Sequence, residues 1–389
     1  MNMDPRLDCD VAIVGAGLVG LATALGLHRA GLRVRVLDRG LPPPLADDYD
    51  LRVFAISPAS ARFLHQLGVW DAVCAERASA YRHMQVWETA PEAALHFDAA
   101  DLHRDDLGHI VESRVLQRHL LAALPSGTLQ QNVTVRAVDA QPQHAVLQLE
   151  RGASLRAALI VAADSARSPL RSARGIAVHQ QAYAQTAVVC HVRSARAHQA
   201  TAYQRFLETG PVALLPLADG RSSVVWSSTH AEPLLAMDDA SFCTALGDAT
   251  QQVLGRIEQC TRRLSFPLAV LNAERYHDDR LVLAGDAAHV VHPLAGQGVN
   301  LGFGDAQELV GAISQARRQA RDIGSARVLA RYNRARQAAA QDMIAVTDGL
   351  YHAYQLQHPA WNWLRQTGLQ AVNATTPLRT ALIRRACGL

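Results

Sequence analysis

A glycine-rich segment between a predicted strand and a predicted helix carries the clearest chemical signal in this chain. Residues 281–284 are all apolar and predict a buried strand, and residues 305–313 have the spacing of an amphipathic helix. Between Asp286 and Asp305 no residue is charged, while glycine recurs. Because ordering glycine costs extra backbone entropy, we expect a loop that approaches a flat ligand, followed by a helix start that suits an anion. The alternative is a glycine-rich turn without a ligand.

A second glycine pattern lies near the N-terminus. Residues 10–14 predict a buried strand, three glycines open a helix that runs to about residue 30, and residues 32–38 alternate as a second strand. In such a β-α-β unit the glycines permit a tight turn and close approach of a pyrophosphate, and the acid at the end of the second strand binds a ribose. The residues concerned are Gly15, Gly17, Gly20 and Asp38. The alternative is a glycine-rich helix start beside a solvated aspartate.

The two glycine patterns together favour one cofactor. The N-terminal unit by itself does not distinguish FAD from NAD. A doubly wound NAD dehydrogenase has no reason to bring a second, distant glycine-rich loop to the same ligand. FAD does, because its adenosine and its isoalloxazine lie far apart. We therefore expect FAD.

Composition limits the class of protein. A chain of 389 residues accommodates two or three domains, and a net charge of +3 is too small to indicate nucleic-acid binding. The six cysteines include no pair at metal-ligand spacing, so we expect no metal site and a reducing compartment. The first residues lack a signal-peptide pattern, and the uncharged run 11–27 is short and glycine-rich for a membrane span. We expect a cytoplasmic protein, with peripheral contact at the inner face of the cell membrane as a further option.

Four motifs carry a resemblance to a known family. Residues 292–305 read HPLAGQGVNLGFGD, residues 52–57 read RVFAIS, residues 112–117 read ESRVLQ, and residues 266–268 read FPL. With these motifs the chain resembles the single-component, FAD-dependent aromatic hydroxylases related to para-hydroxybenzoate hydroxylase. Among them it is most similar to the ubiquinone-biosynthesis hydroxylases. The resemblance spans nearly the whole chain.

The resemblance implies a fold. It predicts an α/β protein with a Rossmann-like FAD-binding domain of the glutathione-reductase type, a second domain with a mixed sheet for the substrate, and C-terminal helices. The FAD-binding domain is expected to be discontinuous, with the substrate between the second sheet and the flavin. The expected ranges are 1–80, 105–175 and 275–325 for the FAD-binding domain, 81–104 and 176–274 for the substrate domain, and 326–389 for the C-terminal helical region.

The resemblance also implies roles for individual residues. The first three glycines would hold the pyrophosphate of FAD and Asp38 its ribose, while Asp286 would bind the ribityl chain or the pyrophosphate. Arg52 and Arg114 would contact the rest of FAD, although each has an alternative as a surface ion pair. His289 and His292 are expected to be structural more than acid–base groups. Residues 293–300 would line the isoalloxazine, with Pro293, Gly296, Gln297 and Gly298 as the catalytic loop and Asp164, Gly298, Val299 and Asn300 as further cofactor contacts.

One motif departs from the family pattern. The family's middle motif reads Ala-Asp-Gly-x-x-Ser-x-x-Arg, whereas residues 163–171 here read ADSARSPLR. Ser165 therefore stands at the glycine position, while Asp164, Ser168 and Arg171 keep theirs. If the backbone there needs a positive φ, serine adds strain of about 1–3 kcal/mol. Since the family ties this motif to FAD and NADPH, the substitution bears more on NADPH use than on FAD binding.

The resemblance implies a reaction. FAD reduced by NAD(P)H or another donor would react with O2, and the resulting flavin hydroperoxide would deliver one oxygen atom to an aromatic ring. The favoured substrate is a polyprenylated phenol or quinol of ubiquinone biosynthesis, with other proteins of that pathway as partners. Two alternatives stay open: a hydroxylase of a soluble aromatic or secondary metabolite, and a non-catalytic FAD-binding scaffold in a biosynthetic complex. Turnover of a prenylated phenol would exclude the scaffold.

The C-terminal segment differs in composition from the rest. After Asp348 no acidic residue follows, while four arginines and two tryptophans alternate with aliphatic residues in 349–389. A basic amphipathic helix with tryptophan is typical of a membrane surface, and a prenylated substrate partitions almost wholly into lipid. The alternative is a helical cap that packs on the FAD-binding domain.

Overall fold

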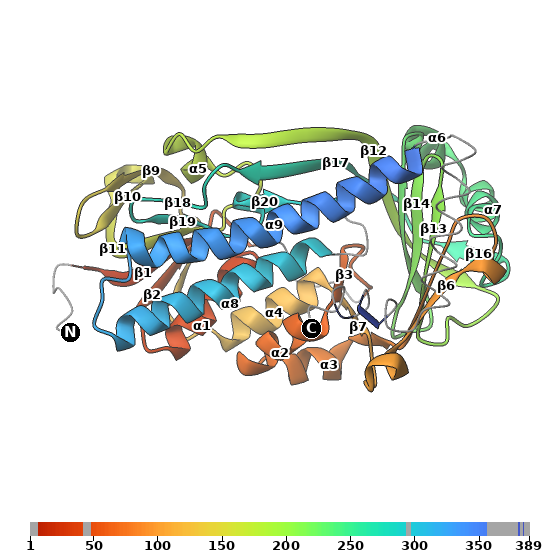
Figure 1. Ribbon diagram of the computed structural model, residues 1–389, viewed down its shortest axis with the longest axis horizontal. Coiled ribbons are helices and arrows are strands. Elements are labelled where there is room, and N and C mark those ends of the chain that lie inside the picture. The colour runs from red at the N-terminus through yellow and green to blue at the C-terminus, as the bar shows by residue number, and fades with distance from the viewer. Residues whose placement is uncertain (1–6, 42–47, 293–296, 356–379, 382–383, 385–389) are drawn as a thin grey trace.

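Two large sheets and one small sheet organise the chain (Figure 1), for which the computed structural model describes residues 7–41, 48–292, 297–355, 380, 381 and 384. The first large sheet has eight strands, and β1 lies at its centre with parallel neighbours on both sides. Strands β1 and β19 and the second half of β11 are nearly continuous apolar runs, as burial on both faces of a parallel sheet requires. The parallel strands are β1 (Cys9–Val14), β2 (Val34–Leu37), β8 (Leu129–Gln130), β11 (Ser154–Ala162) and β19 (Leu281–Leu283).

Antiparallel strands complete this sheet. A hairpin of β9 and β10 extends from β11, and β18 pairs with β19 at the other edge. The short helix α5 packs beside β9. The predicted α/β class with a parallel dinucleotide-binding unit is therefore confirmed. The bounds are β9 (Val135–Ala140), β10 (Ala145–Leu149), η3 (Glu150–Gly152), α5 (Pro169–Ala173) and β18 (His277–Asp278).

Four helices form a layer with the eight-stranded sheet. Helix α1 contacts both α4 and α8, and α9 packs along α8. The approach of α1 to α8 requires glycine at one point, because a Cβ atom on Gly26 would lie 2.7 Å from the Val310 side chain. The bounds are α1 (Leu18–Arg29), α4 (Ser113–Ala123), α8 (Gln297–Arg318) and α9 (Ala326–Gln355).

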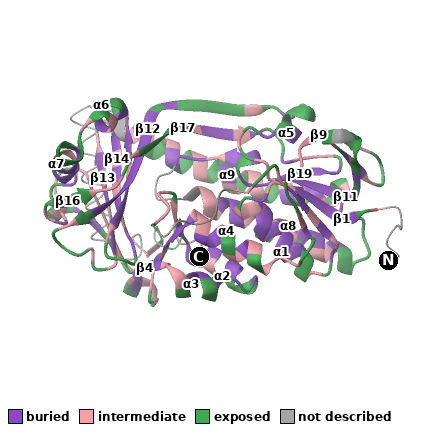
Figure 2. Cartoon of the chain, turned by 180° about the vertical axis from the view of Figure 1, so that it is seen from behind, coloured by how far each residue is buried: buried purple, intermediate pink, exposed green. Residues whose placement is uncertain are grey.

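A second large sheet of nine strands stands at the other end of the molecule (Figure 1). Its strands alternate: Cys190, Val224 and neighbours on one face form a core with α6 and α7, while Val189 and His191 lie on the opposite face. Figure 2 shows the central strands of this sheet as buried. The bounds are β5 (His83–Trp87), β6 (Leu95–Asp98), β12 (Val178–Ser194), β13 (Thr201–Leu207), β14 (Gly210–Pro216), β15 (Ser222–Ser228), α6 (Ala231–Ala236), α7 (Asp239–Ala249), β16 (Ile257–Cys260), β17 (Leu264–Ala273) and β20 (His289–Val290).

A three-stranded sheet connects the two large ones. Its middle strand β7 pairs with β3 and β4, and the loop before β3 contacts the nine-stranded sheet through His191. Strands β5 and β6, which precede β7 in the chain, belong to the nine-stranded sheet. The bounds are β3 (Val53–Ile56), α2 (Pro58–Gln66), α3 (Trp70–Glu76), β4 (Ser79–Tyr81), η1 (Pro91–Ala93), η2 (Ala99–Leu102), β7 (Gly108–Glu112) and η4 (Gly285–Ala287).

The second large sheet agrees with a substrate domain made of two separate segments, because β5 and β6 pair with strands from residues 178–273. The exact domain boundaries stay a prediction. Most of 349–389 lies outside the described residues. In the part of the chain that the structure describes, no helix is both long and apolar enough to cross a membrane.

Candidate functional site

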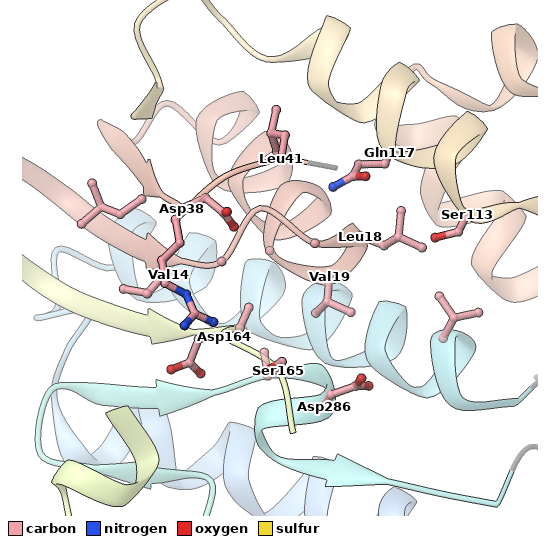
Figure 3. Close-up of a pocket in the computed structure, with 18 of the residues that line it drawn as sticks. Val14, Leu18, Val19, Asp38, Leu41, Ser113, Gln117, Asp164, Ser165 and Asp286 are labelled. Carbon is pink, nitrogen blue, oxygen red and sulfur yellow. The ribbon is translucent and has the colours of Figure 1, made fainter. Parts of the chain in front are cut away.

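A cleft of about 960 Å³ runs along the carboxyl ends of the parallel strands (Figure 3). This is the edge where ligands bind in doubly wound folds. The cleft brings the N-terminal glycine turn and the start of α8 into one site, although more than half of the chain separates them. The predicted site residues that line it are Gly15, Gly17, Gly20, Asp38, Arg52, Arg114, Asp164, Asp286, Gly298 and Val299.

The first glycine turn admits no side chain at two of its positions. Gly15 has φ +110°, and a Cβ atom there would lie 2.1 Å from the carbonyl oxygen of Ala163. A Cβ atom on Gly20 would lie 2.1 Å from the carbonyl oxygen of Gly15. Gly17 has open space beside it and precedes α1 without a side-chain cap. The first amides of α1 therefore remain available to an anion.

Two side chains fix the peptide between the first two glycines of this turn. The Asp38 carboxylate accepts a hydrogen bond from the Ala16 amide at 2.6 Å, and the Gln117 side chain donates to the Ala16 carbonyl at 2.8 Å. The other Asp38 oxygen accepts from the Gly40 amide at 2.8 Å. Each carboxylate oxygen has a further lone pair, so Asp38 can also accept a ribose hydroxyl. In Figure 3, Asp38 and Gln117 lie on opposite sides of the turn.

The opposite wall of the cleft carries a charged group built around Asp50. Its carboxylate accepts a hydrogen bond from the Arg52 amide at 3.1 Å and lies 3.8 Å from Nε of Arg114. Its amide donates to Glu112 at 2.7 Å, and its carbonyl oxygen lies 3.1 Å from Nε2 of His191. Both predicted arginines therefore line the cleft, and Arg114 also takes part in the ion pair that the alternative reading expected.

The middle motif forms the floor of the cleft. Ser165 has φ +81°, so this position does take the conformation that favours glycine, and serine bears the strain there. One Asp164 oxygen accepts from the Leu170 amide at 3.3 Å, while its Oδ1 is buried without a hydrogen-bond partner among the described residues. Burial raises the pKa of Asp164, against the hydrogen bond from Ser168. Arg171 ties this motif to η4 by donating to the Ala287 carbonyl at 2.8 Å.

Behind η4 lies a buried charged network. Asp305, which is fully buried, accepts hydrogen bonds from the Gly285 amide at 2.8 Å, from His289 Nε2 at 2.6 Å and from Arg336 Nε at 2.6 Å. Burial acts to raise the pKa of Asp305, but His289 and Arg336 outweigh it and hold the pKa below its usual range. The network fixes the turn that presents Asp286 to the cleft. His289, which also lines the cleft, therefore has a structural partner.

His292 precedes the predicted flavin loop and is enclosed by aromatic and amide groups. Its Nε2 lies 3.1 Å from the Gln185 side-chain oxygen, and its ring meets that of Tyr183 edge-on at 4.9 Å. The Tyr351 ring lies 6.0 Å away. Burial lowers the pKa of His292 to about 4. The imidazole is thus neutral near pH 7.

The start of α8 differs from the sequence expectation. Helix α8 spans Gln297–Arg318 and thus starts before the amphipathic stretch 305–313 on which the sequence prediction rested. Asn300 does not line the cleft: its side chain accepts from the Ser57 amide at 2.9 Å and donates to the Ala55 carbonyl at 2.7 Å. It thus holds α8 to β3. Pro293 and Gly296 lie outside the described residues, as does the side chain of Gln297.

The residues of the cleft fit FAD. The glycine turn meets the need for close pyrophosphate approach, because side chains on Gly15 and Gly20 would collide with backbone. Asp38 ends β2 at the ribose position, two arginines face the turn across the cleft, and the start of α8 lies at its other end. Within the described residues, no group of three or more His, Cys, Asp or Glu side chains is arranged to hold a metal ion.

Comparison with known proteins decides the family. The model of the FAD binding domain family matches residues 8–347. The chain belongs to this family. Within it, the 3-demethoxyubiquinol 3-hydroxylase of Escherichia coli (strain K12) is 37% identical, with 98% of each chain covered. The human ubiquinone biosynthesis monooxygenase COQ6, mitochondrial, is 35% identical over 96% of this chain and 91% of its own. The predicted family and the predicted FAD cofactor are confirmed.

Two solved structures share the fold of this chain. The p-nitrophenol 4-monooxygenase PnpA of Pseudomonas putida DLL-E4 has a TM-score of 0.78 at 21% identity, with 96% of each chain covered. HpxO of Klebsiella pneumoniae, solved with FAD and uric acid, has a TM-score of 0.77 at 20% identity, with 97% of this chain and 96% of its own covered. At these identities the likeness concerns the fold alone. The chain thus shares the fold of these two proteins.

Several residues that line or support the cleft were missing from the predicted site. Asp50 and Gln117 act on the predicted residues through hydrogen bonds and an ion pair, and Arg336 acts from a helix distant in sequence. Gln117 occurs in the motif at 112–117, which was a signal for it. No sequence signal indicated Arg336, because α9 carries several arginines at similar spacing.

Proposed function

We propose that this chain hydroxylates the aromatic ring of a polyprenylated phenol or quinol in ubiquinone biosynthesis. The observation that carries the proposal is the similarity, over nearly the full length of both chains, to an enzyme named for hydroxylating demethoxyubiquinol. The human relative is named for the same pathway. In such a reaction the protein has to bind and orient the cofactor and provide polar groups in fixed positions. The cleft offers both.

We further propose how the cleft residues hold FAD. Gly15, Gly17 and Gly20 with the start of α1 bind the pyrophosphate, Asp38 binds the ribose, and Arg52 and Arg114 contact the rest of FAD. Asp286 binds the ribityl chain or the pyrophosphate, Asp164 contacts the cofactor from the floor, and Gly298, Val299 and Asn300 contribute to the isoalloxazine end.

At the ring end of the cleft, the protein contributes orientation and charge. When bound, FAD supplies the redox and oxygen chemistry. The N-terminal end of α8 carries a partial positive charge, which would stabilise the negative charge that develops on the isoalloxazine. Pro293, Gly296, Gln297 and Gly298 are proposed to shape this end and exclude water. His292, neutral and hydrogen-bonded to Gln185, anchors the start of that loop.

The electron donor is proposed to be NAD(P)H. Relatives of the hydroxylase type support this, while Ser165 marks the point where the middle motif differs from the family. Since Ser165 lies on the cleft floor with φ +81°, we propose that its effect concerns the reductant rather than FAD retention. The test compares the rates of NADH and NADPH oxidation by Ser165→Gly with those of the parent protein. If the variant and the parent oxidise each donor at the same rate, the proposal is contradicted.

Peripheral membrane contact through 349–389 and contact with other ubiquinone-biosynthesis proteins complete the proposal. A substrate with a long prenyl chain resides in the bilayer, and the basic, tryptophan-containing composition of 349–389 suits an anionic surface. On this basis we propose a cytoplasmic enzyme that works at the inner face of the cell membrane.

Intermediate profiling tests the function directly. In cells that lack this chain, mass spectrometry of the quinone pool should reveal one accumulated prenylated phenol or quinol that lacks a ring hydroxyl. Purified protein with FAD and NAD(P)H should add one oxygen atom to that compound. An unchanged quinone pool would favour the alternative of a soluble-metabolite hydroxylase. Restoration of the pool by a variant unable to bind FAD would favour the scaffold.

A further inference from the structure

Two cysteines meet beside the nine-stranded sheet, away from the cleft. Cys243 lies in the middle of α7, and Cys260 is the last residue of β16. Strand β16 pairs with β12, and α7 packs against β16. Figure 1 shows α7 and β16 together at the end of the molecule that holds the nine-stranded sheet. Because neither cysteine lines the cleft, the pair is separate from the site described above.

The two thiols are in contact with each other. The Cys260 thiol donates a hydrogen bond to the sulfur of Cys243. Its Sγ atom also lies 3.9 Å from the carbonyl oxygen of Asp239, which precedes Cys243 by one turn of α7. Both cysteines pack in the hydrophobic cluster to which Phe242 and Leu246 of the same helix belong. The contact with the helix backbone therefore places Cys260 against the turn that carries Cys243.

The cysteines of this region differ in their access to solvent. Cys260 is half-buried, Cys243 is buried, and Cys190 on the neighbouring strand β12 is buried completely. A small reagent from solvent therefore reaches Cys260 first, with the sulfur of Cys243 next to it. Within the described part of the chain, no third His, Cys, Asp or Glu side chain joins such a pair to form a metal site. The bond that this pair is placed to form is a disulfide.

We infer that Cys243 and Cys260 are a site of reversible disulfide formation by hydrogen peroxide. In the first step the Cys260 sulfur attacks one peroxide oxygen, the O–O bond breaks, and the other oxygen leaves as water with the thiol proton. In the second step the Cys243 sulfur attacks the sulfenic acid on Cys260, the S–O bond breaks, and a second water leaves with the Cys243 proton. The two sulfur atoms thus supply the two electrons that reduce one peroxide molecule. A dithiol reductant returns both thiols by exchange.

The surroundings of the pair determine when the bond forms and what it changes. Burial raises the pKa of both thiols, so both keep their protons near pH 7. Because the thiolate is the reactive form, the pair reacts slowly and becomes oxidised only when peroxide is abundant. Disulfides in a reducing compartment are transient in this way. The bond closes the loop between α7 and β16 and lowers the entropy of the unfolded chain, so oxidation should stabilise this end of the molecule.

Peptide mapping of the FAD-loaded full chain tests the inference. The protein is treated with hydrogen peroxide in the absence of NAD(P)H, its remaining thiols are alkylated, and trypsin then cuts after Arg256, between the two cysteines. Peptides 222–256 and 257–262 contain one cysteine each. Mass spectrometry should find these two peptides joined with the loss of two hydrogen atoms, and dithiothreitol should separate them. The oxidised protein should also have a higher urea midpoint than the reduced protein.

Single variants distinguish this pair from the other thiols. Cys243→Ser should abolish the joined peptides and leave Cys260 as a sulfenic acid that dimedone traps. Cys260→Ser should leave Cys243 as a thiol that is alkylated once the chain is unfolded. The matched control Cys74→Ser removes a half-buried cysteine of α3 and should give the joined peptides at the level of the parent. FAD content and circular dichroism establish that each variant is folded.

Three results would overturn the inference. Absence of the joined peptides from the peroxide-treated parent would show that the two thiols form no bond. Joining of peptide 257–262 to a peptide that carries Cys190 or Cys387 would assign Cys260 a different partner. A lower urea midpoint for the oxidised protein would show that the bond does not fit the native positions of α7 and β16. Because the assay involves no turnover, each of these results leaves the proposed function untouched.

Discussion

The buried Asp305–Arg336 pair gives the sharpest test of how the fold holds the cofactor turn. Asp305 is fully buried, and Arg336 donates one hydrogen bond to it at 2.6 Å and another to the Leu301 carbonyl at 2.9 Å. Replacing Arg336 by methionine keeps much of the side-chain volume but leaves the carboxylate with only His289 and the Gly285 amide as partners. Breaking a buried pair from one side costs about 3–5 kcal/mol, and the remaining partners favour the lower end.

A double-mutant cycle separates the pair from other effects of substitution. In Asp305→Asn, the amide NH2 group must face either Arg336 or Gly285 and His289, all of which are donors themselves. We therefore expect the free energy of unfolding to fall by about 3 kcal/mol. In the double variant Asp305→Asn/Arg336→Met the amide no longer faces the guanidinium, so the loss should fall short of the sum by about 1–2 kcal/mol. Arg334→Met, an exposed arginine of the same helix, should cost less than about 0.5 kcal/mol.

Urea unfolding followed by circular dichroism measures these losses, and titration with FAD measures the consequence for the cleft. Because the network fixes Gly285 and His289, Arg336→Met should also weaken FAD binding, whereas Arg334→Met should not. A loss below about 1 kcal/mol for Arg336→Met, or strict additivity in the cycle, would refute the assignment of the pair as the support of this turn.

Three further predictions concern single positions. Ser165→Gly removes the backbone strain at φ +81°. Once the extra entropy cost of ordering a glycine is subtracted, the variant should be more stable by about 1 kcal/mol, and an unchanged urea midpoint would contradict this. His292 has its pKa lowered to about 4, so the unfolded chain binds the proton first as pH falls, and its contribution is complete above about pH 6.5 and decreases by about 2 kcal/mol at pH 5. His292→Asn should flatten the fall in stability between pH 7.5 and 5, and an unaltered slope would show that another group titrates. Gly15→Ala should yield colourless protein, because its Cβ atom would lie 2.1 Å from a backbone carbonyl; purification with a full complement of FAD would be inconsistent with that geometry.

The sequence predicted the parts of the cleft that depend on local pattern. The glycine turn, the strand that ends at Asp38 and the second glycine-rich loop each follow from neighbouring residues, and their meeting in one cleft follows from the parallel sheet. Asn300 shows the limit of this reasoning. Its place in a cofactor motif predicts a contact with FAD, which stays a prediction, while the structure shows that its side chain joins α8 to β3 through two backbone groups. Tertiary partners of this kind leave no trace in local spacing.

Arg171, Arg336 and His191 extend the same argument to the site as a whole. Each comes from outside the glycine turns and fixes a backbone group in or next to the cleft wall: Arg171 the Ala287 carbonyl, Arg336 the Leu301 carbonyl, and His191 the Asp50 carbonyl. Since His191 belongs to the nine-stranded sheet, movement of that sheet relative to the cleft would shift Asp50 and with it the ion pair to Arg114. The sheet proposed to carry the substrate and the wall proposed to carry FAD are thus joined in part through an imidazole whose pKa is lowered by burial. Its neutral form suits a contact that must persist near pH 7.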